Sequence, residues 1–377
     1  MTKGIRSKIG LVLAIIMVLS LSLAACNTGG GDTGGGGDSG QTAPPPSDSG
    51  SAPEEEAAPP APANTGEVFT VRIGCATVLP SHPNWFMEEL KTALEAKSDQ
   101  FKVELYPANQ LGTNAEMIQG LQNGNVQGVV LPSGLFTSIA PVFVVLSVCG
   151  LIPGADAQYE MLNGTAVGDA IKAEVAKTGV TPLGFLWCPN QEIYVDKEVT
   201  DMAGLKGLKI RGSDAKIVQD TMSAYGASPV VMSSGDVVMG LQQGTINGLF
   251  TDVTFVTPMK TYEKAKYCLK DLPGLPNSNT IMVSNLFLDS LPPDLLEIFT
   301  DTVTEVRERT HEYTIGYEND CYTEMVANGG VILTPSDAFM AEINEKNIEV
   351  AANFATDYIE FAEFYALIAK YVSENIR

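Results

Sequence analysis

One short stretch, residues 208–214, constrains what this chain can fold into more than any other. Apolar and basic side chains alternate at its start, which is typical of a short strand with one buried face. Ser213 and Asp214 suit the start of a helix, which we expect over 215–225. Arg211 therefore lies where a strand ends and a helix begins, and α/β sheets bind ligands at that edge.

This position leaves two interpretations of Arg211 open. A planar, permanently charged guanidinium suits bidentate binding of a carboxylate. The alternative is a surface arginine that pairs with a nearby acidic side chain. The local pattern does not choose between them.

The chain between residues 69 and 131 alternates between strand and helix patterns. We expect strands over 69–76, 101–106 and 126–131, and helices over 81–97 and 114–123. This β-α-β-α-β order predicts a mainly parallel sheet with helices on its faces, and hence an α/β fold.

The same alternation continues further along the chain. The expected elements are a helix over 155–177, strands over 181–186, 208–211, 228–232 and 248–252, and a helix over 237–243. Parallel strands place their C-terminal ends at one edge of a sheet, so Arg211, Ser233, Ser234 and Thr251 should converge. Hydroxyls and backbone N–H groups at the helix start after Ser233 and Ser234 would add a modest anion or hydroxyl site.

A long helix is expected near the C-terminus. Apolar residues recur at close to 3.6-residue spacing over 295–328, with prolines before this segment and two glycines after it. At about 1.5 Å per residue the helix would be about 50 Å long, which exceeds one small lobe. A short strand over 331–334 and a helical segment over 337–375 should follow, and we expect the latter to pack on the second lobe.

The charge balance limits the possible partners. The formal net charge at pH 7 is -22. Such a surface repels phosphates, so no nucleic-acid partner is expected. An anionic ligand would need a local positive site, and Arg211 with Lys209 and Lys206 nearby is the clearest one.

The chain shows no sign of catalytic or metal chemistry. The only histidines are His82 and His311, and we find no GxSxG, HExxH, P-loop or dinucleotide fingerprint. Apart from Cys26, the cysteines are Cys75, Cys149, Cys188, Cys268 and Cys321. An odd number without CxxC spacing describes neither a disulfide framework nor a zinc site, although one pair could still bridge. We therefore expect no enzyme activity, no metal and no cofactor.

The N-terminal segment predicts export. A basic start precedes an apolar run over residues 9–25 that ends in small residues directly before Cys26. We interpret 1–25 as a lipoprotein signal peptide and Cys26 as the lipidated residue. The alternative is an uncleaved membrane anchor, for which about 20 apolar residues are usual. Residues 26–66, rich in Gly, Pro, Ser and Glu, predict a disordered tether.

Four motifs resemble one known family. Residues 201–211 (DMAGLKGLKIR) are similar to the "DLKGLKIR" signature of the DctP-type solute-binding proteins of TRAP transporters. Residues 106–112 (YPANQLG), 226–232 (GASPVVM) and 241–248 (LQQGTING) resemble that family's "YPxxQLG", "GAxPxxM" and "LQxGxxDG". The resemblance runs from about residue 68 to the C-terminus, with the motifs in the family's order and spacing.

The resemblance implies a two-lobed, periplasmic-binding-protein-like α/β fold of the type II kind, with the long helix spanning both lobes. Lobe I would comprise 67–188 plus about 277–316, and lobe II 189–276 plus about 317–377. The ligand cleft would lie between the two lobes.

Other strand ends add candidates for the cleft. Ser133 could donate a hydrogen bond, and Phe136 could form an apolar wall, although packing under the loop is equally open for Phe136. Trp187 is a candidate stacking wall or, alternatively, an interlobe core residue.

Three positions depart from the family. Many members carry a second arginine where this chain has Gln191 followed by Glu192. A glutamate there would oppose an anion or hold a cationic or hydroxyl group, which makes a simple C4-dicarboxylate less expected. An aromatic residue is common at the position of Ser234, and the family's usual amide is replaced by Thr251. Asp252 either binds an ammonium or hydroxyl group or is a solvated loop acid.

The resemblance implies the receptor of a TRAP-type secondary transporter. We expect a monomer that binds a small organic acid between its lobes and delivers it to the membrane permease. A lipid on Cys26 would hold it on the extracytoplasmic side of the membrane. The alternative is a ligand-presenting sensor lipoprotein, and an enzyme is less favoured.

Overall fold

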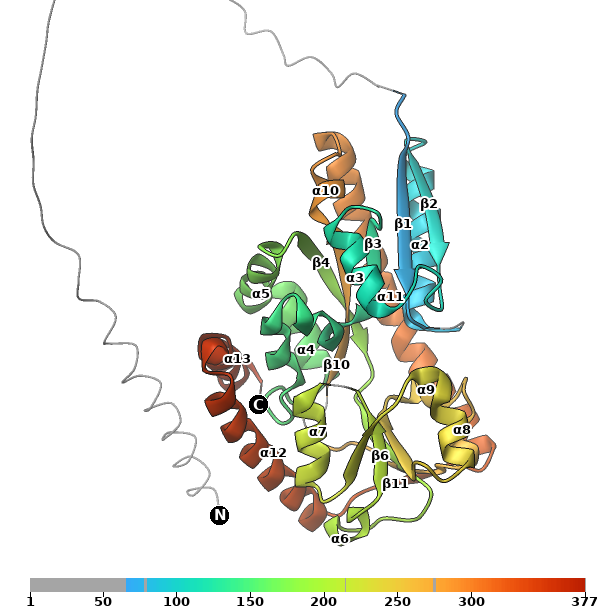
Figure 1. Ribbon diagram of the computed structural model, residues 1–377, viewed down its shortest axis with the longest axis vertical. Helices are drawn as coiled ribbons and strands as arrows, with labels where there is room; N and C mark the ends of the chain where they lie inside the picture. The colour runs from blue at the N-terminus through green and yellow to red at the C-terminus, as the bar shows by residue number, and fades with distance from the viewer. Residues whose placement is uncertain (1–65, 78–79, 214, 274–275, 377) are drawn as a thin grey trace, which may run out of the picture. The chain divides into compact units, whose positions relative to one another are not determined.

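The computed structural model describes residues 66–77, 80–213, 215–273 and 276–376 (Figure 1). The predicted signal peptide, Cys26 and all but the end of the predicted tether lie outside these residues. No helix within the described ranges is long and apolar enough to cross a membrane.

Five strands form the first sheet, in the order β2-β1-β3-β10-β4. They are β1 (Phe69–Cys75), β2 (Phe101–Tyr106), β3 (Gly128–Pro132), β4 (Val180–Cys188) and β10 (Asn277–Ser284). β1 pairs in parallel with β2 and β3, as the alternation predicted, whereas β10 is antiparallel to both β3 and β4. The second half of the chain thus returns to complete the first sheet.

Six strands form the second sheet, in the order β11-β9-β5-β8-β6-β7. They are β5 (Glu192–Val195), β6 (Lys209–Gly212), β7 (Ser228–Val231), β8 (Gly248–Thr251), β9 (Tyr267–Leu269) and β11 (Val331–Leu333). β6 runs parallel to β7 and β8, and β5 is antiparallel to β8 and β9. The chain changes sheet between β4 and β5, between β9 and β10, and between β10 and β11.

Helices surround both sheets (Figure 1). They are α2 (His82–Lys97), α3 (Asn114–Gln122), α4 (Ala155–Gly164), α5 (Ala166–Ala176), α6 (Met202–Leu205), α7 (Lys216–Ala224), α8 (Val237–Gln242), α9 (Val253–Val256), α10 (Asn285–Leu288), α11 (Pro293–Ala327), α12 (Asp337–Asp357) and α13 (Ala362–Asn375). Short 3-10 segments η1 (Ser133–Ser138), η2 (Pro141–Ser147), η3 (Ser234–Asp236), η4 (Thr261–Glu263) and η5 (Ile359–Phe361) complete the list.

The predicted single helix over 155–177 is wrong, because the structure divides it into α4 and α5 at Thr165. Thr165 has extended backbone angles (φ -136°, ψ 163°) and caps α5 by accepting a hydrogen bond from the backbone N–H of Val167. Its own hydroxyl donates to the Met161 carbonyl oxygen at 2.7 Å, which satisfies a group at the end of α4. The local hydrogen bonds of one threonine therefore end one helix and begin the next.

The start of α7 also differs from the expectation. The N-cap residue is Ala215, and no side chain caps this helix. Ser213 lies before that N-cap, and Asp214 is outside the described residues. The strand-to-helix change after Arg211 is nevertheless present, because β6 ends at Gly212 and α7 begins at Lys216.

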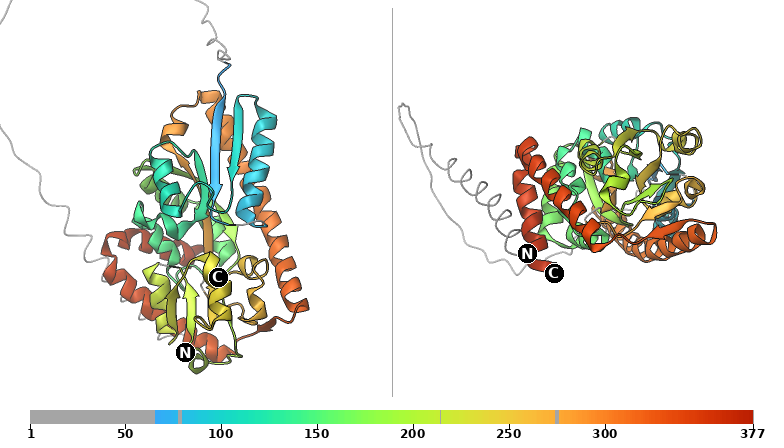
Figure 2. Two further views of the ribbon diagram at one scale, coloured as in Figure 1. Left: turned by 45° about the vertical axis from the view of Figure 1, so that its right-hand side comes forward. Right: turned by 90° about the horizontal axis from the view of Figure 1, so that it is seen from below.

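The long helix α11 has 35 residues and contacts elements of both sheets. It packs on α2 and β4 of the first sheet and on α9 and β11 of the second, and Figure 2 shows it passing beside α2 and continuing downward. Its buried residues include Phe299 and Val303 near its start and Cys321 and Met325 near its end. The predicted helix that spans both lobes is therefore present.

The two C-terminal helices pack on different parts of the fold. α12 packs on α6 and α7 beside the second sheet, as expected. α13 instead packs on α5 and η2, next to the first sheet, which corrects the expectation that all of 337–375 would lie on the second lobe. Ile368 of α13 is fully buried within the core that these helices share. Covering that apolar surface explains the position of α13.

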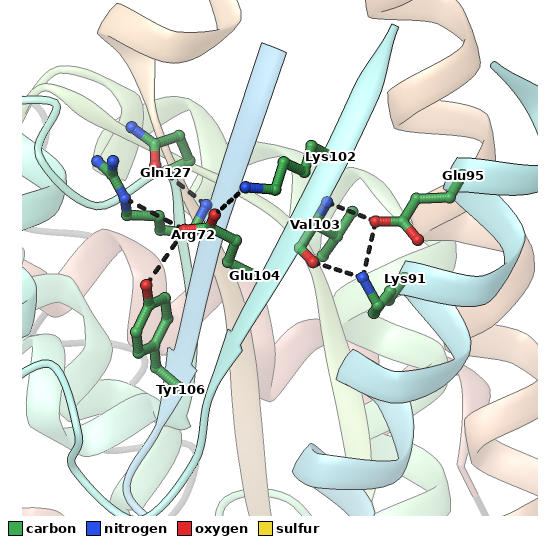
Figure 3. Close-up of polar contacts among 8 residues, drawn as sticks. All are labelled: Arg72, Lys91, Glu95, Lys102, Val103, Glu104, Tyr106 and Gln127. Carbon is green, nitrogen blue, oxygen red and sulfur yellow. Dashed lines mark hydrogen bonds and ion pairs between the residues drawn. The ribbon is translucent and has the colours of Figure 1, made fainter. Parts of the chain in front are cut away.

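Two side chains of α2 form hydrogen bonds to the backbone of the edge strand β2 (Figure 3), and β2 keeps its backbone pairing with β1. Glu95 accepts a hydrogen bond from the Val103 backbone N–H at 2.8 Å, and Lys91 donates to the Val103 carbonyl oxygen at 2.7 Å. Lys91 and Glu95 are also 2.8 Å apart, one helical turn from each other. These contacts satisfy one exposed N–H and one exposed C=O of the edge, which would otherwise be open to pairing.

Candidate ligand-binding site

The ends of β6, β7 and β8 meet around Arg211, as the sequence predicted. Arg211 Nε donates to the carbonyl oxygen of Met232, just after β7, at 3.1 Å. One terminal nitrogen of the guanidinium lies 3.4 Å from Ser234 Oγ, and the guanidinium carbon lies 5.9 Å from the centre of the Phe255 ring in α9. The guanidinium is therefore held at the edge of the sheet by contacts to the segments that follow β7 and β8.

Strand register places Arg211, Thr251 and Glu192 on one face of the second sheet. Arg211 of β6 lies beside Leu249 of β8, and Leu249 lies opposite Tyr194 of β5. Thr251 and Glu192 form the next opposed pair on the same face, two residues further along these two strands. Side chains two residues apart, and directly paired residues, project from the same face of a sheet. Sequence reasoning named Arg211 and Thr251 as ligand-binding residues, and it gave Glu192 a role only in opposing an anion or holding a cationic or hydroxyl group.

Glu192 is a buried carboxyl group, and one of its oxygens has no partner among the described residues. It is 2 % exposed, and its Oε1 accepts a hydrogen bond from the Asp271 backbone N–H at 3.2 Å. Its Oε2 has no partner among the described residues. Burial raises the pKa of Glu192 well above its usual value, and the nearby Lys270 ammonium opposes that shift. What the sequence did not reveal is that Glu192 is buried and lies opposite Thr251.

Asp252 is neither solvated nor turned toward solvent, as one predicted alternative had it. It is 8 % exposed and caps α9, accepting hydrogen bonds from the Thr254 backbone N–H at 3.0 Å and from the Thr254 hydroxyl. Burial raises the pKa of Asp252, and the hydrogen bonds from Thr254 oppose that shift. A carboxylate at a helix N-terminus is stabilised by the helix dipole and by the N–H groups of the first turn.

The serines after β7 are exposed, and one is already engaged locally. Ser233 Oγ donates to Asp236 Oδ2 at 2.5 Å, and both residues are exposed. Ser234 is exposed and faces Arg211, as described above. The structure therefore brings Ser234 and Arg211 together, with Ser233 beside them in the chain.

Ser133 and Phe136 lie in η1, directly after the end of β3 of the first sheet, and both are buried. Ser133 is 4 % exposed, and its hydroxyl lies 2.8 Å from both the Ser278 and the Thr280 hydroxyl oxygens of β10. Phe136 is 0 % exposed, and its ring centre lies 5.7 Å from that of Phe143. This position of Phe136 suits the packing alternative rather than the predicted apolar wall.

Trp187 ends β4 beside two side chains that sequence reasoning did not connect to it. Its indole Nε1 donates to Asp156 Oδ1, at the start of α4, at 2.7 Å. Its ring centre lies 5.8 Å from that of His311 in α11. Trp187 is 7 % exposed, so only a small part of the ring is open. Gln191 follows in the connection from β4 to β5 and is half-buried.

A carboxyl group of α11 faces the same region. Burial raises the pKa of Glu318 to about 7; Lys270 opposes the shift, and the carboxylates of Asp252 and Asp156 add to it. Asp252 follows β8 of the second sheet, and Asp156 lies at the start of α4, beside Trp187. The connecting helix therefore supplies an acidic group near residues from both halves of the fold.

A buried group of Cys188, His82 and Asn279 superficially resembles a nucleophile with its base. His82 Nε2 lies 3.2 Å from Cys188 Sγ, and Asn279 Nδ2 lies 2.8 Å from His82 Nε2 and 3.0 Å from Cys188 Sγ. Burial raises the pKa of the Cys188 thiol and lowers the pKa of His82 to about 4. A nucleophilic cysteine requires the opposite shift, so this group has no activated thiolate.

The five cysteines within the described residues, Cys75, Cys149, Cys188, Cys268 and Cys321, are all buried, free thiols. The sequence had left one disulfide open, and none links these five residues. The described part of the chain also contains no group of three or more His, Cys, Asp or Glu side chains arranged to hold a metal ion.

Comparison with known protein sequences identifies related chains. YiiZ of Salmonella typhimurium, whose function is uncharacterised, is 27% identical over 202 residues, which are 53% of this chain and 61% of YiiZ. The C4-dicarboxylate-binding periplasmic protein DctP of Rhodobacter capsulatus is 29% identical over 51% of this chain and 58% of its own length. The matched region thus spans about three-fifths of the length of these two relatives.

Comparison with solved structures shows the same fold. A TRAP periplasmic solute-binding protein from a Sulfitobacter species, with bound β-D-galacturonate, has a TM-score of 0.75 at 18% identity and covers 80% of this chain and 99% of its own. The TRAP periplasmic solute-binding protein of Haemophilus influenzae, with bound L-gulonate, has a TM-score of 0.74 at 20% identity, with the same coverage. The predicted two-lobed, type II-like fold is therefore confirmed.

The model of one protein family, bacterial extracellular solute-binding protein family 7 (DctP), matches residues 80–357. That range contains every strand of both sheets except β1, and it ends with α12, so that α13 lies outside it. This chain therefore belongs to family 7 of the bacterial extracellular solute-binding proteins, the DctP family.

Proposed function

We propose that this protein captures a small organic acid and that Arg211 binds the ligand's carboxylate. The observation that carries the proposal is the position of Arg211 at the converging ends of β6, β7 and β8, where Met232 and Ser234 orient its guanidinium. A guanidinium in a fixed orientation recognises the planar carboxylate group by paired hydrogen bonds. The net charge of -22 makes such a local positive site necessary for any anionic ligand.

The ligands of similar structures support this ligand class. Structures of the same fold hold β-D-galacturonate, L-gulonate and succinate, each of which carries at least one carboxylate. In our proposal Ser233, Ser234, Thr251 and Asp252 line the second-sheet side of the cleft. Trp187, Gln191 and Ser133 line the other side, and Phe136 supports that side from below.

The long helix α11 couples ligand capture to a change in the relative position of the two lobes. α11 packs on both sheets, so the two halves can pivot while the helix keeps contact with each. Closure over a bound acid removes water from around Arg211. Because electrostatic attraction rises as the local dielectric falls, the closed form strengthens the pairing of Arg211 with the carboxylate.

We further propose where the protein acts. A lipid on Cys26 holds it on the extracytoplasmic side of the membrane, with 26–66 as a tether of some tens of ångströms, at about 5–6 Å times the square root of the residue number. The closed, loaded form docks on the membrane subunits of a TRAP-type permease. We propose no catalytic step, because the Cys188 and His82 pair carries pKa shifts that oppose nucleophilic chemistry.

A thermal-shift screen of the purified chain tests the ligand class. The panel holds uronates, aldonates, keto acids, dicarboxylates and amino acids, with neutral sugars and amines of similar size as controls. We expect at least one carboxylate to raise the melting temperature, and at 100 times its Kd it should stabilise the fold by about 2.7 kcal/mol. Stabilisation only by neutral sugars or amines would contradict the proposal. A denatured sample is also analysed by mass spectrometry, so that a co-purified ligand is identified rather than missed.

A further inference from the structure

The second sheet places a carboxyl group at a defined separation from Arg211. β5, β8 and β6 are neighbours in the sheet, so Glu192 and Arg211 lie two strands apart, on either side of Thr251. Glu192 is in register with Thr251, and Arg211 with Leu249, two residues earlier. Strand spacing and rise then put the Cα atoms of Glu192 and Arg211 about 12 Å apart.

This separation fits a small ligand with a polar group at each end. Glu192 contacts Asp271, which follows β9, and Arg211 contacts Met232, which follows β7, so the two side chains lean apart. After two hydrogen bonds of about 2.9 Å, a ligand that reaches both must therefore span at least roughly 6 Å. A five-carbon acid with a polar terminal group has about this length.

One buried oxygen of Glu192 is an acceptor that lacks a partner among the described residues. Oε1 is occupied by the Asp271 backbone N–H, whereas Oε2 is buried without a hydrogen bond among the described residues. A buried polar atom without a partner is rare, because leaving it unsatisfied costs about 1–3 kcal/mol. Tyr194 and Tyr322, which face the same core, also have buried hydroxyl oxygens without partners.

The charges around Glu192 are mixed but mainly acidic. Lys270 and Asp271 follow β9, beside Glu192 in the sheet, and Glu318 faces it from α11. Lys270 is already paired with Asp271 at 2.8 Å, and its ammonium also lies 5.1 Å from the centre of the Tyr322 ring. A second carboxylate on the ligand would meet Glu192 and Glu318 there, whereas a hydroxyl or ammonium would not be repelled.

We propose that Glu192 determines ligand specificity by accepting a hydrogen bond, at Oε2, from a hydroxyl or ammonium group at the end of the ligand opposite the carboxylate bound by Arg211. The inference rests on the proposed function and narrows its ligand class from organic acids in general to acids that carry a hydrogen-bond donor. Arg211 thus binds one end of the ligand and Glu192 the other, with Thr251 between them in the sheet.

A matched series of five-carbon probes tests the inference. The series is pentanoate, 5-hydroxypentanoate, 5-aminopentanoate and glutarate, which differ only at the far end, with D-glucuronate as a cyclic hydroxy acid. Affinities for the wild-type chain are measured by calorimetry. We expect the probes with a hydroxyl or ammonium group to bind at least tenfold more tightly than pentanoate, and glutarate to bind no more tightly than pentanoate. The hydroxy and amino members then show which donor is preferred.

Two variants assign the preference to Glu192. Glu192→Leu should bring all probes to the affinity of pentanoate, whose own affinity should not change. Glu192→Gln keeps an oxygen for the Asp271 N–H and serves if the leucine variant does not fold. It should abolish the preference for 5-aminopentanoate, because an amide N–H₂ group then faces the ammonium. Glu198→Gln, an exposed glutamate shortly after β5, is the matched control and should leave every affinity unchanged.

The outcomes separate this inference from the proposed function. A preference for donor-bearing probes that persists in both Glu192 variants overturns the inference. A preference for glutarate over all other probes also overturns it, because Lys270 would then recognise the far end. In either case carboxylates still bind and the proposed function stands. If no carboxylate, in the series or in the wider panel, binds the wild-type chain, the proposed function itself fails and the inference falls with it.

Discussion

His82 lies 5 % exposed at the start of α2, and its burial lowers its pKa to about 4. In contrast, burial raises the pKa of Glu192 and Asp252. Both shifts have one cause, because removing a group from water penalises its charged form. Arg211 differs, because its guanidinium cannot lose its proton in a protein and therefore keeps its charge. A permanently charged, planar group suits the recognition of a carboxylate.

His82 should make the protein less stable in mild acid. Its pKa is about 4 in the folded state and 6.5 in the unfolded state, so between these values the unfolded chain binds the extra proton. This contribution to stability is complete above pH 6.5 and is lost as the pH falls toward 4. Between pH 7 and pH 5 the loss should be about 2 kcal/mol. Urea unfolding at both pH values measures it.

The comparison that isolates His82 is with His82→Gln, which does not titrate. The raised carboxyl pKa values of Glu192, Asp252 and Glu318 stabilise the fold as the pH falls, and they act equally in both proteins. We expect the wild type to lose about 2 kcal/mol more than the variant over this range. Equal losses would show that His82 is accessible to protons in the folded state.

The buried thiols should not react while the protein is folded. Burial raises the pKa of Cys149 and Cys321 to about 11, and raises those of Cys75, Cys188 and Cys268 as well. The reactive thiolate is therefore scarce at pH 8, and the sulfurs are covered. In a Cys26→Ser chain, an aromatic disulfide reagent should detect no thiol in the folded state and five after denaturation. Three thiols after denaturation would reveal a disulfide, and rapid reaction of the folded protein would place one sulfur at the surface.

At the scale of single elements, α11 holds the fold together, and its glycines have opposite roles. Gly316 is exposed inside the helix, with no atom within 4 Å of where a Cβ would lie. Gly329 follows the helix with a φ of +95°, a conformation that L-residues rarely adopt. Glycine weakens a helix interior but is favoured just after a helix end.

Two alanine substitutions test this difference within one helix. Gly316→Ala should increase the free energy of unfolding by about 0.5–1 kcal/mol, because alanine restricts the unfolded chain and favours the helix. Gly329→Ala should decrease it by about 1 kcal/mol, because the new side chain strains the left-handed backbone. Chemical denaturation of the two variants and the wild type measures both changes. A loss of stability in Gly316→Ala would mean that α11 bends at this point in the folded protein.

Elements with a regular local pattern could be predicted from sequence, and those that depend on distant partners could not. The strand at Phe69–Cys75 and the helix at Pro293–Ala327 follow from apolar periodicity alone. β10 was not predicted, because Asn277–Ser284 begins with polar residues whose partners lie in β3 and β4, far away in sequence. The break at Thr165 was missed because the apolar pattern continues across it, and only the hydrogen bonds of that side chain interrupt the helix.

At the scale of the whole molecule, the convergence of strand ends was predictable, whereas the detailed lining of the site was not. The β-α repeat places Arg211 and Ser234 at one edge, and the structure shows them in contact. The same reasoning cannot reveal that Phe136 faces Phe143, because that contact depends on the fold of two consecutive 3-10 segments without a regular apolar period. It also cannot reveal that Glu192 lies beside Thr251, because that pairing joins strands far apart in the chain. Sequence periodicity assigns the face of an element, and tertiary packing decides what covers that face.

Calorimetric titration of wild type and Arg211→Ala with the best-stabilising carboxylate tests the central claim most directly. Truncating one partner of a desolvated, hydrogen-bonded charge pair costs about 2–5 kcal/mol, so we expect affinity to fall by about 30-fold or more. The melting temperature of the ligand-free variant should stay within a few degrees of the wild type, because the Arg211 contacts to Met232 and Ser234 lie at a partly exposed sheet edge. Undiminished affinity in a folded Arg211→Ala protein would contradict the account and make Arg211 a residue that only supports the segment after β7.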